Sequence, residues 1–182
     1  MVKHFYFFYT YYQYMNNYKN KGMYSEDLVN KTCEYYLVNE IAFISKRFLP
    51  IQILEKKENK VRGLLLNKST VDYNGMYNGL YIDFEVKETN KDYFNLDILK
   101  KHQKEHLFLI NKLNGISFLI VGFINEQDHF FALNYKDIIK LSDQKIKKIN
   151  LDYCYKNFFN IKIIFPGILD LISFLNWNNK LM

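Results

Sequence analysis

The clearest hydrophobic pattern of the chain lies between residues 80 and 87. Apolar and polar side chains alternate strictly there, the apolar ones being Leu80, Ile82, Phe84 and Val86. A period of two predicts a β-strand with one apolar face and one polar face. Glu85 and Lys87 are two residues apart, so they project side by side from the polar face.

The residues before this strand predict a reversal of the chain. The Asn-Gly pairs at 74–75 and 78–79 favour tight turns, because Asn and Gly tolerate positive φ. A turn of this kind folds the chain back and brings Asp72 to Glu85. Two carboxylates and the Lys87 ammonium group at one sheet edge suit a site that binds a hard divalent cation and cleaves phosphodiesters.

The remaining patterns predict an α/β protein with a mixed sheet. Helices are expected at 25–40, 95–114 and 135–141 with a closing helix near 175, and strands at 41–48, 51–54, 61–66, 116–124, 130–133 and from 161. The apolar run at 116–124 predicts a central strand buried on both faces. In the helix after Asn95, the amide of Gln103 falls within the apolar arc, so it faces the sheet and needs a polar partner there.

Composition and charge restrict the partners and the cellular compartment that are expected for the protein. Its 182 residues carry a formal net charge of +6, which favours a polyanionic partner. No uninterrupted apolar segment is long enough for a membrane helix. Cys33 and Cys154 form no metal-binding or redox motif, and a reduced, cytoplasmic protein is expected. Residues 1–21 are rich in aromatics and lysines, and we expect a mobile terminal arm before a single domain at 22–182.

Longer sequence segments around the central pattern resemble those of a known family. Asp72-x12-Glu85-x-Lys87 resembles the PD-(D/E)xK nuclease core. The words Ser-Thr-Val-Asp-Tyr-Asn-Gly-Met-Tyr (69–77) and Tyr-Ile-Asp-Phe-Glu-Val-Lys-Glu-Thr (81–89) are similar to the RecU family of Holliday junction resolvases. Gly22-Met23, the segment 41–50, His102-Gln103 and the run 115–120 fit the same family. The resemblance covers residues 22–140 in order.

The resemblance implies a fold, a reaction and a set of site residues. The fold is a PD-(D/E)xK nuclease-like central mixed sheet flanked by helices, with a short protruding β stalk at about 51–66. The activity is Mg²⁺-dependent hydrolysis (Mn²⁺ as a substitute) that resolves Holliday junctions by symmetric nicks in DNA recombination and repair. The catalytic residues implied are Asp72, Glu85, Lys87 and Gln103, and the metal ligands are Thr70, Asp72, Glu85 and Gln103. A homodimer bound to a four-way DNA junction is implied, with other recombination proteins as further partners.

The stalk is the feature in which this chain departs from the family. Only residues 51–71 separate Pro50 from Asp72, which is short for a RecU protein. The expected stalk tip is basic, and its DNA-binding side chains are predicted to be Lys56, Lys57, Lys60 and Arg62. The short stalk puts the strength of junction selectivity in question.

Three alternatives stay open at this point. His102, Glu105 and His106 satisfy the H-x-x-E-H pattern of inverted zinc peptidases. The second alternative is a protein of the nuclease fold that binds branched DNA without cutting it, although all four implied catalytic residues are present. The third concerns Glu26, which either supports a metal site or is simply an acid in the first turn of a helix.

Overall fold

The computed structural model describes residues 24–66, 70–125 and 127–180, so the predicted arm at 1–21 lies outside the described residues. The elements in chain order are α2 (Tyr24–Val38), β1 (Phe43–Lys46), β2 (Ile51–Lys57), β3 (Lys60–Leu65), β4 (Tyr73–Tyr77), β5 (Leu80–Thr89), β6 (Tyr93–Asn95), η1 (Leu96–Ile98), α3 (Lys101–Lys112), β7 (Ile116–Phe123), β8 (His129–Asn134), α4 (Tyr135–Asp143), β9 (Lys148–Asn150), α5 (Leu151–Asn157), β10 (Phe159–Ile161), β11 (Ile163–Ile164), β12 (Ile168–Leu169) and α6 (Leu171–Asn179).

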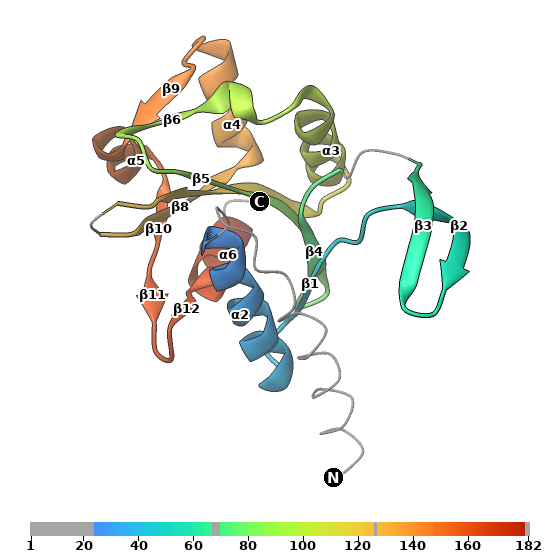
Figure 1. Ribbon diagram of the computed structural model, residues 1–182. Helices are drawn as coiled ribbons and strands as arrows, with labels where there is room; N and C mark the ends of the chain where they lie inside the picture. Colours follow the sequence, from blue (N-terminus) through green and yellow to red (C-terminus); the bar gives the residue numbers. More distant parts are fainter. Residues whose placement is uncertain (1–23, 67–69, 126, 181–182) are drawn as a thin grey trace.

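A mixed sheet forms the centre of the molecule, in the strand order β1-β4-β5-β7-β8-β10. Strands β5 and β7 are parallel, and the other neighbours are antiparallel. Helices α2 and α6 cover one face, and α3 and α4 cover the other (Figure 1). Each face has its own apolar core, so β7 is buried on both sides as its sequence predicts. The predicted mixed α/β sheet flanked by helices is confirmed.

Strand β5 has the predicted alternation, but the middle of its polar face is not open to solvent. Ile82, Phe84 and Val86 enter the core beneath α2 and α6. Asp83 and Glu85 are also fully buried, because α3 packs over that side of the strand. Burial of two neighbouring acids costs free energy, so each requires polar partners.

Only one of the two Asn-Gly pairs makes the predicted turn. Asn78 and Gly79 have positive φ values of 48° and 77° and join β4 to β5. The pair at 74–75 lies within β4, where the prediction of a turn is wrong. Gly75 is needed there because β1 passes so close that a Cβ would collide with the carbonyl oxygen of Phe43.

The helix that carries Gln103 starts later than predicted. Asn95 caps the short 3₁₀ helix η1 through its side-chain oxygen, which accepts from the Asp97 N–H. The α-helix α3 begins only at Lys101, because Leu99 and Lys100 are extended. Strand β9 and helix α5 were not predicted; β9 pairs with β6 beside the central sheet.

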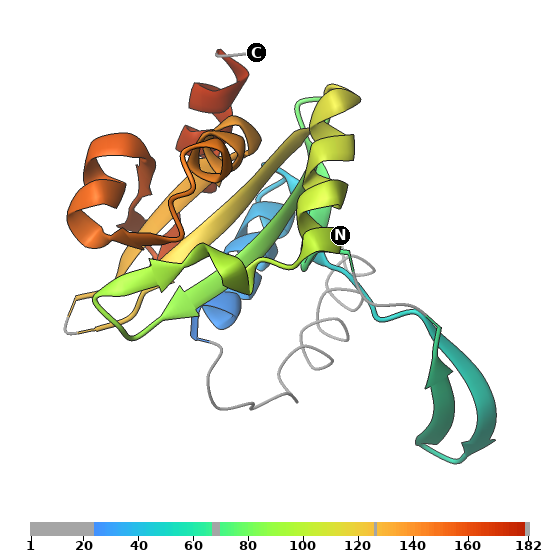
Figure 2. The same ribbon diagram turned by 90° about the horizontal axis from the view of Figure 1, so that it is seen from above.

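The stalk is a two-stranded hairpin made of β2 and β3 and separate from the central sheet (Figures 1 and 2). Every residue of both strands is exposed. The predicted stalk at 51–66 is therefore present. Its strands extend further toward the tip than predicted, with the reversal at residues 58–59 and an irregular register between Ile53 and Glu55. None of the described helices is both long enough and apolar enough to span a membrane.

Candidate functional site

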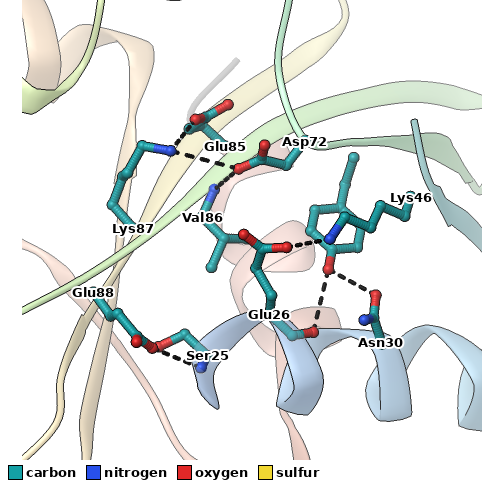
Figure 3. A network of polar contacts seen from close by, with 10 residues as sticks. Ser25, Glu26, Asn30, Lys46, Asp72, Glu85, Val86, Lys87 and Glu88 are labelled. Carbon is teal, nitrogen blue, oxygen red and sulfur yellow. Dashed lines mark hydrogen bonds and ion pairs between the residues drawn. The ribbon is translucent and has the colours of Figure 1, made fainter. Parts of the chain in front are cut away.

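The three residues of the central motif meet at one place on the sheet (Figure 3). Asp72 precedes β4, and the pairing of Tyr73 with Phe84 brings it against β5. Its Oδ2 accepts a hydrogen bond from the Val86 N–H at 3.1 Å. The Lys87 Nζ lies 3.8 Å from the same oxygen and forms an ion pair with Glu85 Oε1. The predicted convergence of Asp72, Glu85 and Lys87 is thus present in the structure.

Gln103 reaches the same site from α3. Its Nε2 donates to Glu85 Oε1, and its own Oε1 accepts from the Lys100 N–H at 3.0 Å. The residue is 7% exposed, which agrees with the prediction that it faces the sheet. One amide therefore caps α3 and orients Glu85. Its predicted role as a metal ligand stays a prediction.

Several buried side-chain oxygen atoms of the described residues have no hydrogen-bond partner. They are Glu85 Oε2, Thr70 Oγ1 and, at the start of α2, Ser25 Oγ. Buried polar atoms are nearly always paired, so an unpaired carboxylate oxygen is chemically expensive. Oxygen donors of this kind match the preference of Mg²⁺, and Asp72 adds a second carboxylate. The residues that were expected to hold a hard cation therefore fit one, although the described residues contain no group of three or more His, Cys, Asp or Glu side chains suited to a metal.

The electrostatics of the site leave the negative charge of Glu85 poorly compensated. Burial and the negative charge of Asp72 raise the pKa of Glu85 to about 7, even though Lys87 acts to lower it. Burial lowers the pKa of Lys87, but its hydrogen bond with Glu85 and the charges of Asp72 and Glu85 outweigh this and raise it. A divalent cation held by Asp72 and Glu85 would compete with a proton for Glu85.

The start of α2 lies directly against this site (Figure 3). Glu26 forms an ion pair with Lys46. The Ser25 N–H donates to Glu88 Oε2 at 2.8 Å, which joins the N-terminus of α2 to β5. Glu26 is thus both an acid in the first turn of a helix and a charge within reach of the site, since it contributes to the raised pKa of Lys87.

The predicted DNA-binding residues lie on the hairpin and not among the carboxylates. The cross-strand pairs Lys57–Lys60 and Glu55–Arg62 belong to one face, whereas Lys56 pairs with Val61 on the other. The four basic side chains therefore divide between the two faces. Their DNA contacts stay a prediction.

A second polar cluster beside the site was missed by sequence reasoning. Arg47 and His106 both contact the buried carboxylate of Asp83. The available signals were the place of Asp83 on the same strand face as Glu85 and the spacing of three residues between Gln103 and His106. The cluster also leaves the zinc alternative unsupported, because His106 Nε2 is engaged by Asp83 and Glu105 is exposed, 3.6 Å from Lys101.

Comparisons with known proteins identify the family of the chain. The family model described as "Recombination protein U" matches residues 20–177. A protein of Ureaplasma parvum named "Holliday junction resolvase RecU" is 37% identical over 163 residues, which cover 89% of this chain and 95% of that protein. Proteins of the same name from Mycoplasmopsis pulmonis (90% of this chain and 97% of that protein) and Bacillus subtilis (87% and 81%) are each 35% identical.

Among solved structures, a Holliday junction resolvase of Archaeoglobus fulgidus is similar with a TM-score of 0.44 and 10% identity, covering 72% of this chain and 93% of that one. The match of the family model to most of the chain decides the assignment. The chain belongs to the RecU family.

Proposed function

We propose that this protein is a structure-selective endonuclease that resolves Holliday junctions by Mg²⁺-dependent hydrolysis of phosphodiester bonds. The observation that carries the proposal is the convergence of Asp72, Glu85 and Lys87, with Glu85 Oε2 buried and unpaired. The names of its relatives support the same activity and substrate.

Each residue of the site has a distinct role in the proposed reaction. Asp72 and Glu85 would hold a Mg²⁺ or Mn²⁺ ion, with Thr70 and Gln103 completing or orienting its ligands. Such an ion supplies Lewis-acid stabilisation of the phosphate and activates the attacking water. Lys87 lies between the two carboxylates and would donate to a phosphate oxygen or orient the water. Gln103 holds Glu85 in place from α3.

Resolution of a junction requires two nicks in strands of like polarity. A homodimer with an isologous interface would supply two equivalent sites related by a twofold axis, as a four-way junction demands. We therefore include the homodimer in the proposal. Other recombination proteins as partners and a cytoplasmic location stay predictions.

The test is a cleavage assay on a mobile four-way junction and on a linear duplex of the same sequence. With Mg²⁺, we expect paired nicks at symmetric positions in the junction and little cutting of the duplex. Mapping of the products on sequencing gels measures both. A protein that binds the junction but cuts it with neither Mg²⁺ nor Mn²⁺ is instead the non-cleaving branched-DNA-binding protein.

The stalk makes a separate prediction about selectivity. Phosphate contacts provide affinity but do not distinguish a junction from a duplex. Selectivity for junctions therefore requires a projecting element such as the β2–β3 hairpin. Replacement of residues 55–60 by an Asn-Gly turn shortens this hairpin and leaves the site unchanged. The junction-over-duplex affinity ratio should fall by about tenfold or more, equivalent to ~1.4 kcal/mol, with duplex binding nearly unchanged.

Competition binding at one fixed salt concentration measures this ratio. The matched control is Lys162→Gln, which also removes one net positive charge but lies next to β10, at the opposite edge of the sheet from β1. Full junction preference in the shortened variant would move the source of selectivity away from the hairpin.

A further inference from the structure

A buried ionic cluster lies next to the proposed catalytic site and has no assigned role. Its centre is the carboxylate of Asp83, whose side chain is 0% exposed. Arg47 Nη2 lies 2.9 Å from Asp83 Oδ1 and 2.7 Å from Oδ2. His106 Nε2 lies 2.7 Å from Oδ2, and the Tyr81 hydroxyl donates to the same oxygen at 3.2 Å.

The partners of Asp83 come from separate parts of the chain. Arg47 follows β1 at the base of the stalk, Tyr81 and Asp83 belong to β5, and His106 belongs to α3. A wholly buried carboxylate is tolerated only when charged or polar partners surround it. Since buried ion pairs add little net stability against an apolar alternative, the arrangement is better understood as a device that fixes geometry.

One hydrogen bond and one shared strand face link this cluster to Asp72 and Glu85. The main-chain N–H of Arg47 donates to the carbonyl oxygen of Asp72 at 2.8 Å. Asp83 is two residues before Glu85 on the same face of β5, and both are buried under α3. Arg47 therefore holds the backbone of one proposed metal-binding residue and the side chain beside the other.

The third link passes through α3. His106 lies one helical turn after Gln103, so both side chains leave the same side of the helix. Gln103 binds Glu85 and His106 binds Asp83, so successive turns of α3 contact successive acids of β5. A change in the His106 contact would alter how α3 sits on β5, and with it the position of the Gln103 amide.

We propose that Arg47, Asp83 and His106 act as positioning residues for the phosphodiesterase site. They hold the Asp72 backbone and the Gln103 helix at the spacing from Glu85 that cation binding requires. This inference rests on the proposed function, and it assigns the three residues an effect through the Asp72 backbone and Gln103 instead of a direct contact with cation or DNA. Loss of an outer contact of this kind lowers metal affinity or activity by about tenfold to a hundredfold.

The central test is His106→Ala, with Glu105→Ala as the matched control. Glu105 is the neighbouring residue of α3, and its side chain is 63% exposed. We expect His106→Ala to lower the cleavage rate by about tenfold at saturating junction and a Mg²⁺ concentration that does not saturate the wild type. The dissociation constant for the junction in Ca²⁺ should stay at the wild-type value in both variants, and Glu105→Ala should cut normally.

Binding of Mn²⁺ alone, measured by isothermal titration calorimetry, gives a readout that does not depend on cleavage. His106→Ala should bind Mn²⁺ about tenfold more weakly than wild type, and His106→Gln should recover much of the loss, because its amide can donate to the same Asp83 oxygen. If the wild-type protein binds Mn²⁺ but does not cut the junction, the proposed function is wrong. The comparison of Mn²⁺ affinities between wild type and His106→Ala still tests the positioning role in that case.

A double-mutant cycle identifies the route through α3. If His106 acts by placing Gln103, adding His106→Ala to Gln103→Ala should cost little beyond Gln103→Ala alone. If His106→Ala does not fold, Arg47→Lys is the alternative variant, because it keeps the positive charge but loses the planar guanidinium group. It should weaken Mn²⁺ binding by a similar factor. Wild-type Mn²⁺ affinity and cleavage rate in folded His106→Ala and Arg47→Lys would overturn the inference.

Discussion

Glu85→Gln is expected to abolish junction cleavage and to leave junction binding in Ca²⁺ close to wild type. The substitution keeps the size of a side chain that is buried between Lys87 and Gln103 but removes its negative charge. Without that charge the site would offer a cation one carboxylate instead of two. Lewis-acid stabilisation is worth several kcal/mol, so the rate should fall by about a thousandfold or more.

Asp72→Asn should behave in the same way, because Asp72 contributes the other carboxylate. The control is Glu88→Gln, on the same strand as Glu85, because a Gln oxygen can still accept the hydrogen bond from the Ser25 N–H. Gel-based cleavage rates and fluorescence anisotropy measure the two quantities on one labelled junction. A folded Asp72→Asn, Glu85→Gln double variant that cuts at the wild-type rate would exclude this site as the catalytic centre.

Lys87→Ala is expected to lower the cleavage rate by about a hundredfold or more, the usual cost of losing one donor to a transition state. The ammonium group lies next to both carboxylates, so it would be within reach of a phosphate bound at this site. Because an ammonium is no metal ligand, the affinity for Mg²⁺ should change little when Glu85 is ionised.

The pH of this experiment matters. Lys87 acts to lower the pKa of Glu85, which is nevertheless raised to about 7, so its removal raises that pKa further. Near neutral pH a protonated Glu85 would imitate a loss of Mg²⁺ affinity. Rates and affinities should therefore be compared over a pH series that extends to about pH 9, because the variant requires a higher pH than the wild type for Glu85 to be ionised. The control is Lys91→Ala, which lies just beyond β5. Equal cleavage rates for Lys87→Ala and Lys91→Ala would show that Lys87 has no role in catalysis.

Local patterns predicted much of the fold and the centre of the site. The alternation in β5 reflects the period of two of a strand, and the apolar run of β7 is typical of a strand buried on both faces. Both patterns can be read directly from the sequence. The turn at Asn78 and Gly79 follows from the backbone freedom of those two residues. Together they bring Asp72 to Glu85, because an antiparallel pair with a short turn has only one register.

Tertiary packing decided the features that depend on segments far apart in the chain. Asn74 and Gly75 carry the same turn signal as Asn78 and Gly79, but β1 pairs with them and keeps them in a strand. The start of α3 at Lys101, and not after Asn95, depends on the Gln103 oxygen that caps it and on Glu85, which binds the same amide.

The burial of Asp83 and its contacts with Arg47 and His106 could not be predicted, since 36 and 23 residues separate these partners. The sequence by itself determined which side chains share a face of β5 and of α3. Only the tertiary structure decided that the polar face of β5 is buried against the side of α3 that carries Gln103 and His106. The physical reason is that strand and helix periods are local properties of the backbone, whereas the packing of one element on another depends on the whole core.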